Sequence, residues 1–91
     1  MAIKLEPLAD FYLNLGGVHY ILGEFLEALR IFDMGLEIND KHVLLHFSRG
    51  NVLSVLNDVE AALESFETAV KMQPDFRAPE QYIRRLRGEL K

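Results

Sequence analysis

The sequence predicts an all-α fold in which five helices pack as antiparallel pairs into a short solenoid, and two observations predict it. Apolar residues recur three or four positions apart along most of the chain, which is the spacing of one face of an α-helix. The sequence also matches itself without a gap when it is shifted by 34 residues, and six positions are then identical where chance gives about two. The identical pairs are Gly16–Gly50, Val18–Val52, Leu22–Leu56, Ala28–Ala62, Leu29–Leu63 and Phe32–Phe66.

The predicted helices end where turn-forming residues interrupt the apolar pattern, at 23–24, 39–40, 57–58 and 73–75. Asp58 is expected to cap the fourth helix and Asp75 the fifth, because a carboxylate accepts hydrogen bonds from the free N–H groups of a first turn. Connections of two to four residues make neighbouring helices antiparallel. The expected helices span residues 8–22, 25–38, 42–56, 59–72 and 77–90.

Small residues inside the helices indicate where helices cross closely. A glycine in mid-helix, such as Gly16, costs about 0.5–1 kcal/mol relative to alanine, so we expect a neighbouring helix to need the space. Ala28 offers the matching flat surface on the second helix, and Phe32 is expected to fill the space between helix pairs. The same three roles are expected of the counterparts 34 residues later.

Composition restricts the class of protein. The chain has 91 residues, 49% of them hydrophobic, which fits one compact domain. It has no cysteine, which excludes disulfides and cysteine-ligated metals. No apolar run reaches the roughly 18 residues of a membrane span, and the first residues lack a signal-peptide pattern. We therefore expect a cytoplasmic, intracellular protein that does not insert into membranes.

Charge argues against a nucleic-acid partner. The net charge is −4, and residues 1–76 alone carry 5 basic against 12 acidic residues. Phosphate binding requires a positive face, and only the stretch from Arg77 onward is basic. This stretch is interpreted as a solvated last helix, with RNA association as a remote alternative.

The repeat resembles the tetratricopeptide repeat, a 34-residue helix–turn–helix unit. The first copy departs from the family pattern at Asp40, where the family has proline, and the second departs at His46 and Arg49, where it has a large aromatic residue and leucine. The resemblance implies one domain over 1–91, with repeat one at 9–42, repeat two at 43–76 and a capping helix at 77–90. The motif residues are Tyr12, Leu15, Gly16, His19, Ala28, Phe32 and Asp40, and then His46, Arg49, Gly50, Leu53, Ala62, Phe66 and Pro74.

The resemblance further implies a scaffold or adaptor that binds proteins, and no enzyme activity. In that family the first helix of each pair lines a concave groove, which here would be apolar and would hold a peptide or an amphipathic helix. The alternative is that several of these residues pack on their own neighbours. The groove residues carried over by position are Leu13, Asn14, Gly17, Tyr20, Ile21, Leu44, Phe47, Ser48, Asn51, Val55, Ala78, Gln81, Tyr82 and Arg85.

Family members that hold chaperone tails use a carboxylate clamp of Lys, Asn and Arg. The clamp is absent here, because its positions fall on Leu13, Gly17, Ser48, Ala78 and Tyr82. The alternative function is self-assembly into a homo-oligomer, or service as a piece of a longer solenoid, because two repeats are fewer than the three that usually bury a continuous core.

No metal or cofactor site is predicted. His42 and His46 have the i, i+4 spacing of a chelate, but no third ligand accompanies them, so both are interpreted as packing residues. The sequence has no phosphate-binding loop and no recognisable nucleophile context, so catalysis is not expected.

Overall fold

The computed structural model describes residues 6–74 and residue 88 of the chain. Within this part the chain is all-helical, which confirms the predicted class. The observed ends of the first four helices lie within two residues of the predicted ones, and the predicted fifth helix, 77–90, lies outside the described residues except for residue 88. The four helices are α1 (Glu6–Ile21), α2 (Phe25–Ile38), α3 (Val43–Val55) and α4 (Val59–Met72).

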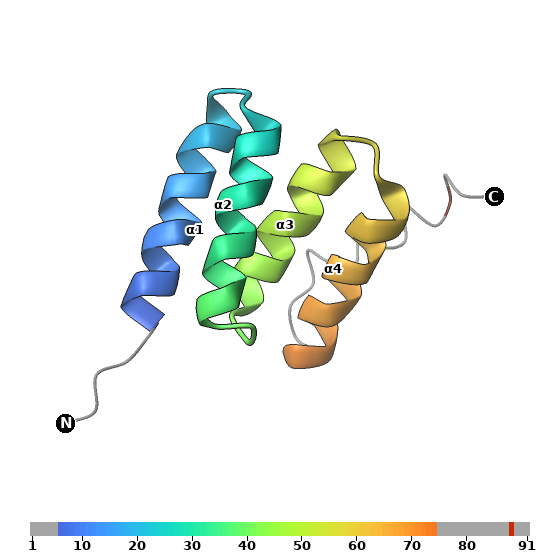
Figure 1. The fold of residues 1–91 in the computed structure, drawn as a ribbon. Coiled ribbons are helices and arrows are strands. Elements are labelled where there is room, and N and C mark those ends of the chain that lie inside the picture. The colour runs from blue at the N-terminus through green and yellow to red at the C-terminus, as the bar shows by residue number, and fades with distance from the viewer. Residues whose placement is uncertain (1–5, 75–87, 89–91) are drawn as a thin grey trace.

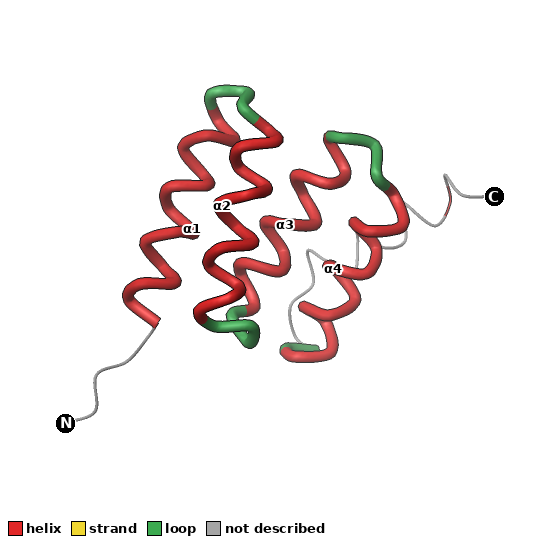
Figure 2. The backbone as a smooth tube through the Cα atoms, viewed as in Figure 1, coloured by secondary structure: helices red, strands yellow, loops and turns green. Residues whose placement is uncertain are grey.

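The helices form two antiparallel pairs that lie side by side. α1 packs on α2 and α3 packs on α4, and the two pairs meet mainly where α2 lies against α3 (Figures 1 and 2). α1 also touches α3, so the first helices of the two pairs are neighbours across the array. This arrangement is the predicted helix-pair solenoid.

The turn inside each pair has the same design. Gly23 and Asn57, which the 34-residue shift aligns, both have positive φ, at 81° and 66°. Glycine adopts this left-handed conformation without strain and asparagine tolerates it, so each can close the end of a helix. Asp58 then caps α4 by accepting from the N–H of Ala61 at 3.4 Å, as predicted, whereas Asp75 lies outside the described residues.

A phenylalanine fills the crossing inside each pair. A Cβ atom added to Gly16 would lie 2.6 Å from Cδ1 of Phe32, and one added to Gly50 would lie 2.6 Å from Cε1 of Phe66. Each ring lies over the glycine of its own pair, and Phe32 also packs against Leu45 and Val52 of the next pair, so for Phe32 the expectation that the ring fills the space between pairs holds as well. The glycines remove the side chain that would otherwise hold the two helices apart.

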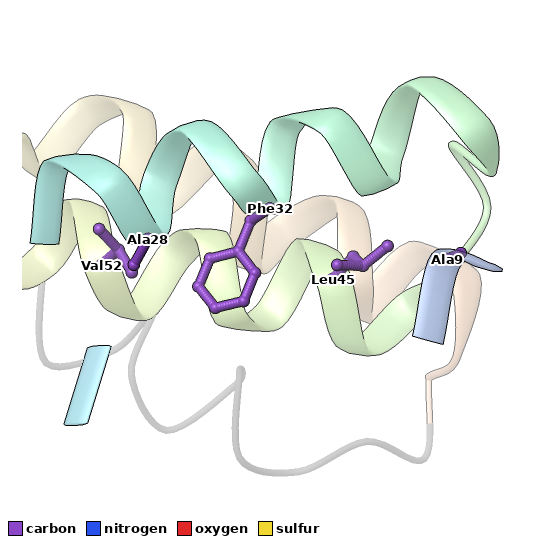
Figure 3. Close-up of a cluster of buried hydrophobic side chains, with 5 residues drawn as sticks. All are labelled: Ala9, Ala28, Phe32, Leu45 and Val52. Atoms are coloured by element: carbon purple, nitrogen blue, oxygen red, sulfur yellow. The ribbon is translucent and has the colours of Figure 1, made fainter. Parts of the chain in front are cut away.

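The first core cluster joins α1, α2 and α3. Figure 3 shows its five buried side chains in a row with the Phe32 ring at the centre. Because its members come from three helices, this cluster holds the second pair against the first. The cluster consists of Ala9, Ala28, Phe32, Leu45 and Val52.

Candidate functional site

A small pocket of about 90 Å³ opens between α1 and α3. Gly17 and Tyr20 line it from α1, Ser48 and Asn51 line it from α3, and Phe32 reaches it from α2. Four of these five residues belong to the groove that the resemblance implies. The structure therefore brings together residues that lie some 30 positions apart in the sequence, because consecutive pairs stack with their first helices adjacent.

Gly17 keeps the pocket open. A Cβ atom added there would meet nothing within 4 Å, whereas one added to Gly16 would collide with Phe32. Successive residues on an α-helix are rotated by about 100°, so the two neighbouring glycines face different sides. Gly16 allows α1 and α2 to cross, and Gly17 leaves its own part of the pocket wall without a side chain.

The chemistry of the pocket is apolar with a few polar atoms. Tyr20 and Phe32 contribute aromatic rings, and Tyr20 also packs edge-to-face on Phe25 with ring centroids 5.4 Å apart. The Ser48 hydroxyl and the Asn51 amide contribute a donor or an acceptor each. None of the lining residues in the described part of the chain carries a formal charge at neutral pH, so this lining suits an uncharged group.

The other groove residues divide into two groups. Leu13 packs on the first core cluster, and the Phe47 ring lies 5.7 Å from that of Phe66 in the second cluster, so both side chains have structural contacts of their own. The second group is exposed and does not line the pocket; it comprises Asn14, Ile21, Leu44 and Val55. Ala78, Gln81, Tyr82 and Arg85 lie outside the described residues.

The two histidines with chelate spacing make structural hydrogen bonds. His42 caps α3, because its Nδ1 accepts from the N–H of Leu45 at 3.4 Å, and its Nε2 lies 2.6 Å from the Asp10 carboxylate. His46 Nε2 lies 2.7 Å from the carbonyl oxygen of Asp40 and donates to it. Across residues 6–74, no group of three or more His, Cys, Asp or Glu side chains could hold a metal ion.

Sequence reasoning missed two features of this region. Phe32 was assigned to packing alone, yet it also lines the pocket. Arg49 was treated as a departure from the family leucine, yet it bonds Asp33 and Ser65, each 16 residues away. The acidic residue at 33 was the available signal, but only the stacking of pairs brings it to α3.

No helix in the described part of the chain is long and apolar enough to cross a membrane.

Comparison with known proteins finds a matching family model and similar sequences. A family model described as "Tetratricopeptide repeat" matches residues 44–76, a stretch that covers α3 and α4. The chain is 27% identical over 74 residues to human tetratricopeptide repeat protein 6 and 29% identical over 75 residues to human tetratricopeptide repeat protein 13. These matches cover 81% and 82% of this chain but span only 14% and 9% of the relatives' length.

A solved structure shows the same fold. The first tetratricopeptide repeat domain of Spaghetti (RPAP3), bound to the HSP90 peptide SRMEEVD, superposes with a TM-score of 0.88. The superposition covers 90% of this chain and 65% of that one, at 17% sequence identity. The 34-residue period, the glycine–phenylalanine crossings and these matches agree: the chain is similar in sequence to tetratricopeptide repeat proteins and shares its fold with the solved tetratricopeptide repeat domain.

Proposed function

We propose that this chain is a non-enzymatic protein-interaction module that binds an apolar segment of a partner, as a peptide or a helix, at the pocket between α1 and α3. The observation that carries the proposal is the pocket itself, which four residues of the implied groove line from two different helices. The similar structure with a bound peptide supports it, since that protein has the same fold.

The size and lining of the pocket indicate what it holds. At about 90 Å³ it is smaller than the roughly 300–1,000 Å³ of small-molecule sites, so it suits one side chain of a longer segment. Tyr20 and Phe32 favour an aliphatic or aromatic anchor. Ser48 and Asn51 can bond the backbone on either side of that anchor, which fixes the direction of the segment.

The acidic peptide of the similar structure does not fit this lining. The clamp positions that fall within the described residues are Leu13, Gly17 and Ser48, and none of them is a cation. An acidic peptide would therefore give up its hydration without gaining an ion pair here. We expect the peptide SRMEEVD to bind no better than a scrambled peptide of the same composition.

The experiment blocks the pocket by substituting Gly17 with residues that have a side chain. Peptides are first selected from a random library on the wild-type protein and are then measured against Gly17→Ala and Gly17→Leu. Binding should fall in the order Gly, Ala, Leu, because a larger side chain at a residue that lines the pocket takes up more of its space, and an added Cβ atom there meets nothing within 4 Å. A thermal melt of each variant verifies that the fold is retained.

Asn14→Leu serves as the matched control. It adds the same side chain to α1, three residues from Gly17, at an exposed position that does not line the pocket. Selected peptides should bind this variant as they bind the wild type. Equal binding of those peptides to Gly17→Leu would refute the proposed site.

A further inference from the structure

A stripe of four apolar side chains on α1 is exposed at three positions and half-buried at the fourth, Leu15. We call Phe11, Leu15, Val18 and Leu22 the outer stripe. Phe11, Val18 and Leu22 are 55%, 52% and 66% exposed, and Leu22 continues the last turn of α1 through its hydrogen bond to Val18. The sequence contains no Asp, Glu, Lys or Arg from Phe11 to Gly23. Loss of charged residues over an exposed helix face is typical of the centre of a protein interface.

The corresponding positions on α3 show that such a stripe is suited to helix packing. The 34-residue shift aligns Phe11 with Leu45 and Val18 with Val52, and both of these α3 residues are fully buried with residues of α2 in the first core cluster. On α3 these positions are therefore covered by a helix. On α1 the same positions are exposed.

Charge distinguishes between the possible occupants of the stripe. Where α2 packs on α3, Asp33 of α2 forms an ion pair with Arg49 of α3, and the Arg49 Nε atom lies 2.7 Å from the Asp33 carboxylate. The α1 counterpart of Arg49 is Leu15, which cannot pair with a carboxylate. A helix like α2 would place the half-exposed Asp33 carboxylate beside Leu15 without a cation to pair with, whereas a wholly apolar surface brings no unpaired charge. The outer stripe is itself such a surface.

The stripe is complementary to itself. Its intervals of four, three and four residues read the same in both directions. Two copies of α1 packed antiparallel therefore place Phe11 beside the partner's Leu22 and Leu15 beside the partner's Val18, about a two-fold axis near Gly16 and Gly17. Each of these two contacts joins a larger apolar side chain to a smaller one, and no charged side chain lies between the two helices.

The area is close to what a stable dimer needs. With about 150–200 Å² for a fully exposed large apolar side chain, the low end of the range for aromatic residues, Phe11, Val18 and Leu22 together with the flanking Leu8 and Ile21 expose roughly 500 Å² of apolar surface per protomer. At the roughly 65% apolar content of homodimer interfaces, this corresponds to an interface of about 750 Å² per protomer. A standard interface buries about 800 Å² per partner.

We propose that this protein forms a two-fold symmetric homodimer through the outer stripe of α1. The dimer uses a different side of α1 from the pocket, since Gly17 does not belong to the stripe. Peptide binding and dimerisation are therefore separable, and failure of one leaves the other standing.

Sedimentation equilibrium of the full chain tests the proposal, at about 5 to 500 μM, a range that brackets the micromolar affinity of a small interface. The wild type should sediment as a dimer in the upper part of this range. Val18→Glu should weaken the dimer at least tenfold, because it buries two uncompensated carboxylates. Leu44→Glu is the matched control, since Leu44 is 44% exposed but lies on α3, and it should leave the dimer intact.

A monomer at every concentration would overturn the proposal, and so would a dimer that Val18→Glu does not weaken. The first result would mean that the stripe is covered by the rest of this chain or by a helix of another protein. Circular dichroism of both variants should show unchanged helicity, so that loss of the dimer reflects the surface and not the fold.

Cysteine cross-linking tests the orientation, because the chain has no cysteine of its own. Under mild oxidation, Leu15→Cys mixed with Val18→Cys should give a mixed disulfide dimer. Leu15→Cys mixed with Leu44→Cys should not. Preferential joining of Leu15→Cys to itself would overturn the antiparallel pairing.

Discussion

Arg49 and Asp33 tie the two helix pairs together. The guanidinium of Arg49, on α3, donates from Nε to the Asp33 carboxylate on α2 at 2.7 Å. Its Nη1 donates to the hydroxyl of Ser65 on α4, also at 2.7 Å. Ser65 is the buried polar residue in the core of the described chain, at 2% exposed. One side chain at a position where the family has leucine thus bonds residues on both neighbouring helices.

Arg49→Ala should lower the free energy of unfolding by about 1–2 kcal/mol, mostly because the buried Ser65 hydroxyl loses its partner. The Asp33 contact adds less, since the Asp33 side chain is 47% exposed and water screens it. Urea unfolding followed by circular dichroism measures the change.

The matched control for Arg49→Ala is the double variant Arg49→Leu/Ser65→Ile, which copies the apolar residues Leu15 and Ile31 at the same positions of the first repeat. Removing both polar partners together should restore most of the lost stability. A double variant less stable than Arg49→Ala would contradict this account.

Gly16→Ala and Gly17→Ala should change stability in opposite directions. Gly16→Ala should cost about 1–3 kcal/mol, because the new methyl group meets the buried Phe32 ring. Gly17→Ala should stabilise the helix by about 0.5–1 kcal/mol, because its methyl group meets nothing and alanine is the better helix former. The melting temperatures of both variants and of the wild type, measured under one condition, test whether the changes are opposite in sign. Each variant is the control for the other.

His42 should prove to have two separable roles. Since Nδ1 accepts from the N–H of Leu45, Nε2 carries the proton of the neutral ring and donates to Asp10. His42→Ala loses the cap of α3 and the link to α1, and should cost about 1–2 kcal/mol. His42→Asn keeps a capping oxygen and should recover about half of that loss in a thermal melt. Equal losses for the two variants would show that the cap contributes nothing.

The exposed pair Glu27–Arg30 gives a pH-dependent signal. The hydrogen bond from Arg30 lowers the pKa of Glu27 below its ordinary value of 4.5. A carboxylate whose folded pKa is depressed contributes stability that is present above pH 4.5 and is lost as the pH falls through the folded pKa. NMR titration of the Glu27 carboxyl carbon should show this pKa rising in Arg30→Met, and also rising in the wild type at high salt. An unchanged pKa in Arg30→Met would refute the assignment.

The helices and their pairing could be predicted because they depend on local patterns. Apolar spacing gives each helix a face, and the residues at 23, 57 and 58 give two of the turns and a cap. The exact period of 34 residues then implies that both pairs are built alike. Gly16 was correctly interpreted as a close crossing, since a glycine in mid-helix has few other uses.

The contents of the crossings and of the pocket could not be predicted in the same way. Phe32 packs over Gly16 of its own pair and also against Leu45 and Val52 of the next pair. This double contact depends on the rotation of the helices about their axes, which apolar spacing fixes only to within a broad arc. Arg49 reaches Asp33 only because the two pairs stack. From the sequence alone, Arg49 is therefore only a departure from the leucine of the repeat pattern. Tyr20 shows the same ambiguity, because it lines the pocket and also supports Phe25.

The contacts that join the two pairs have a consequence for how the protein loses its structure. In a stacked array, the units unfold together only when the coupling between neighbours is strong enough relative to the stability of each unit. Here one part of that coupling is the ion pair Arg49–Asp33, and the rest consists of the hydrogen bond between His42 and Asp10 and the apolar cluster around Phe32. Salt weakens the ion pair and spares the apolar cluster. The sharpness of the unfolding transition, and the degree to which amide hydrogen exchange in α4 follows that in α1, therefore vary with ionic strength even where the helices themselves are unchanged.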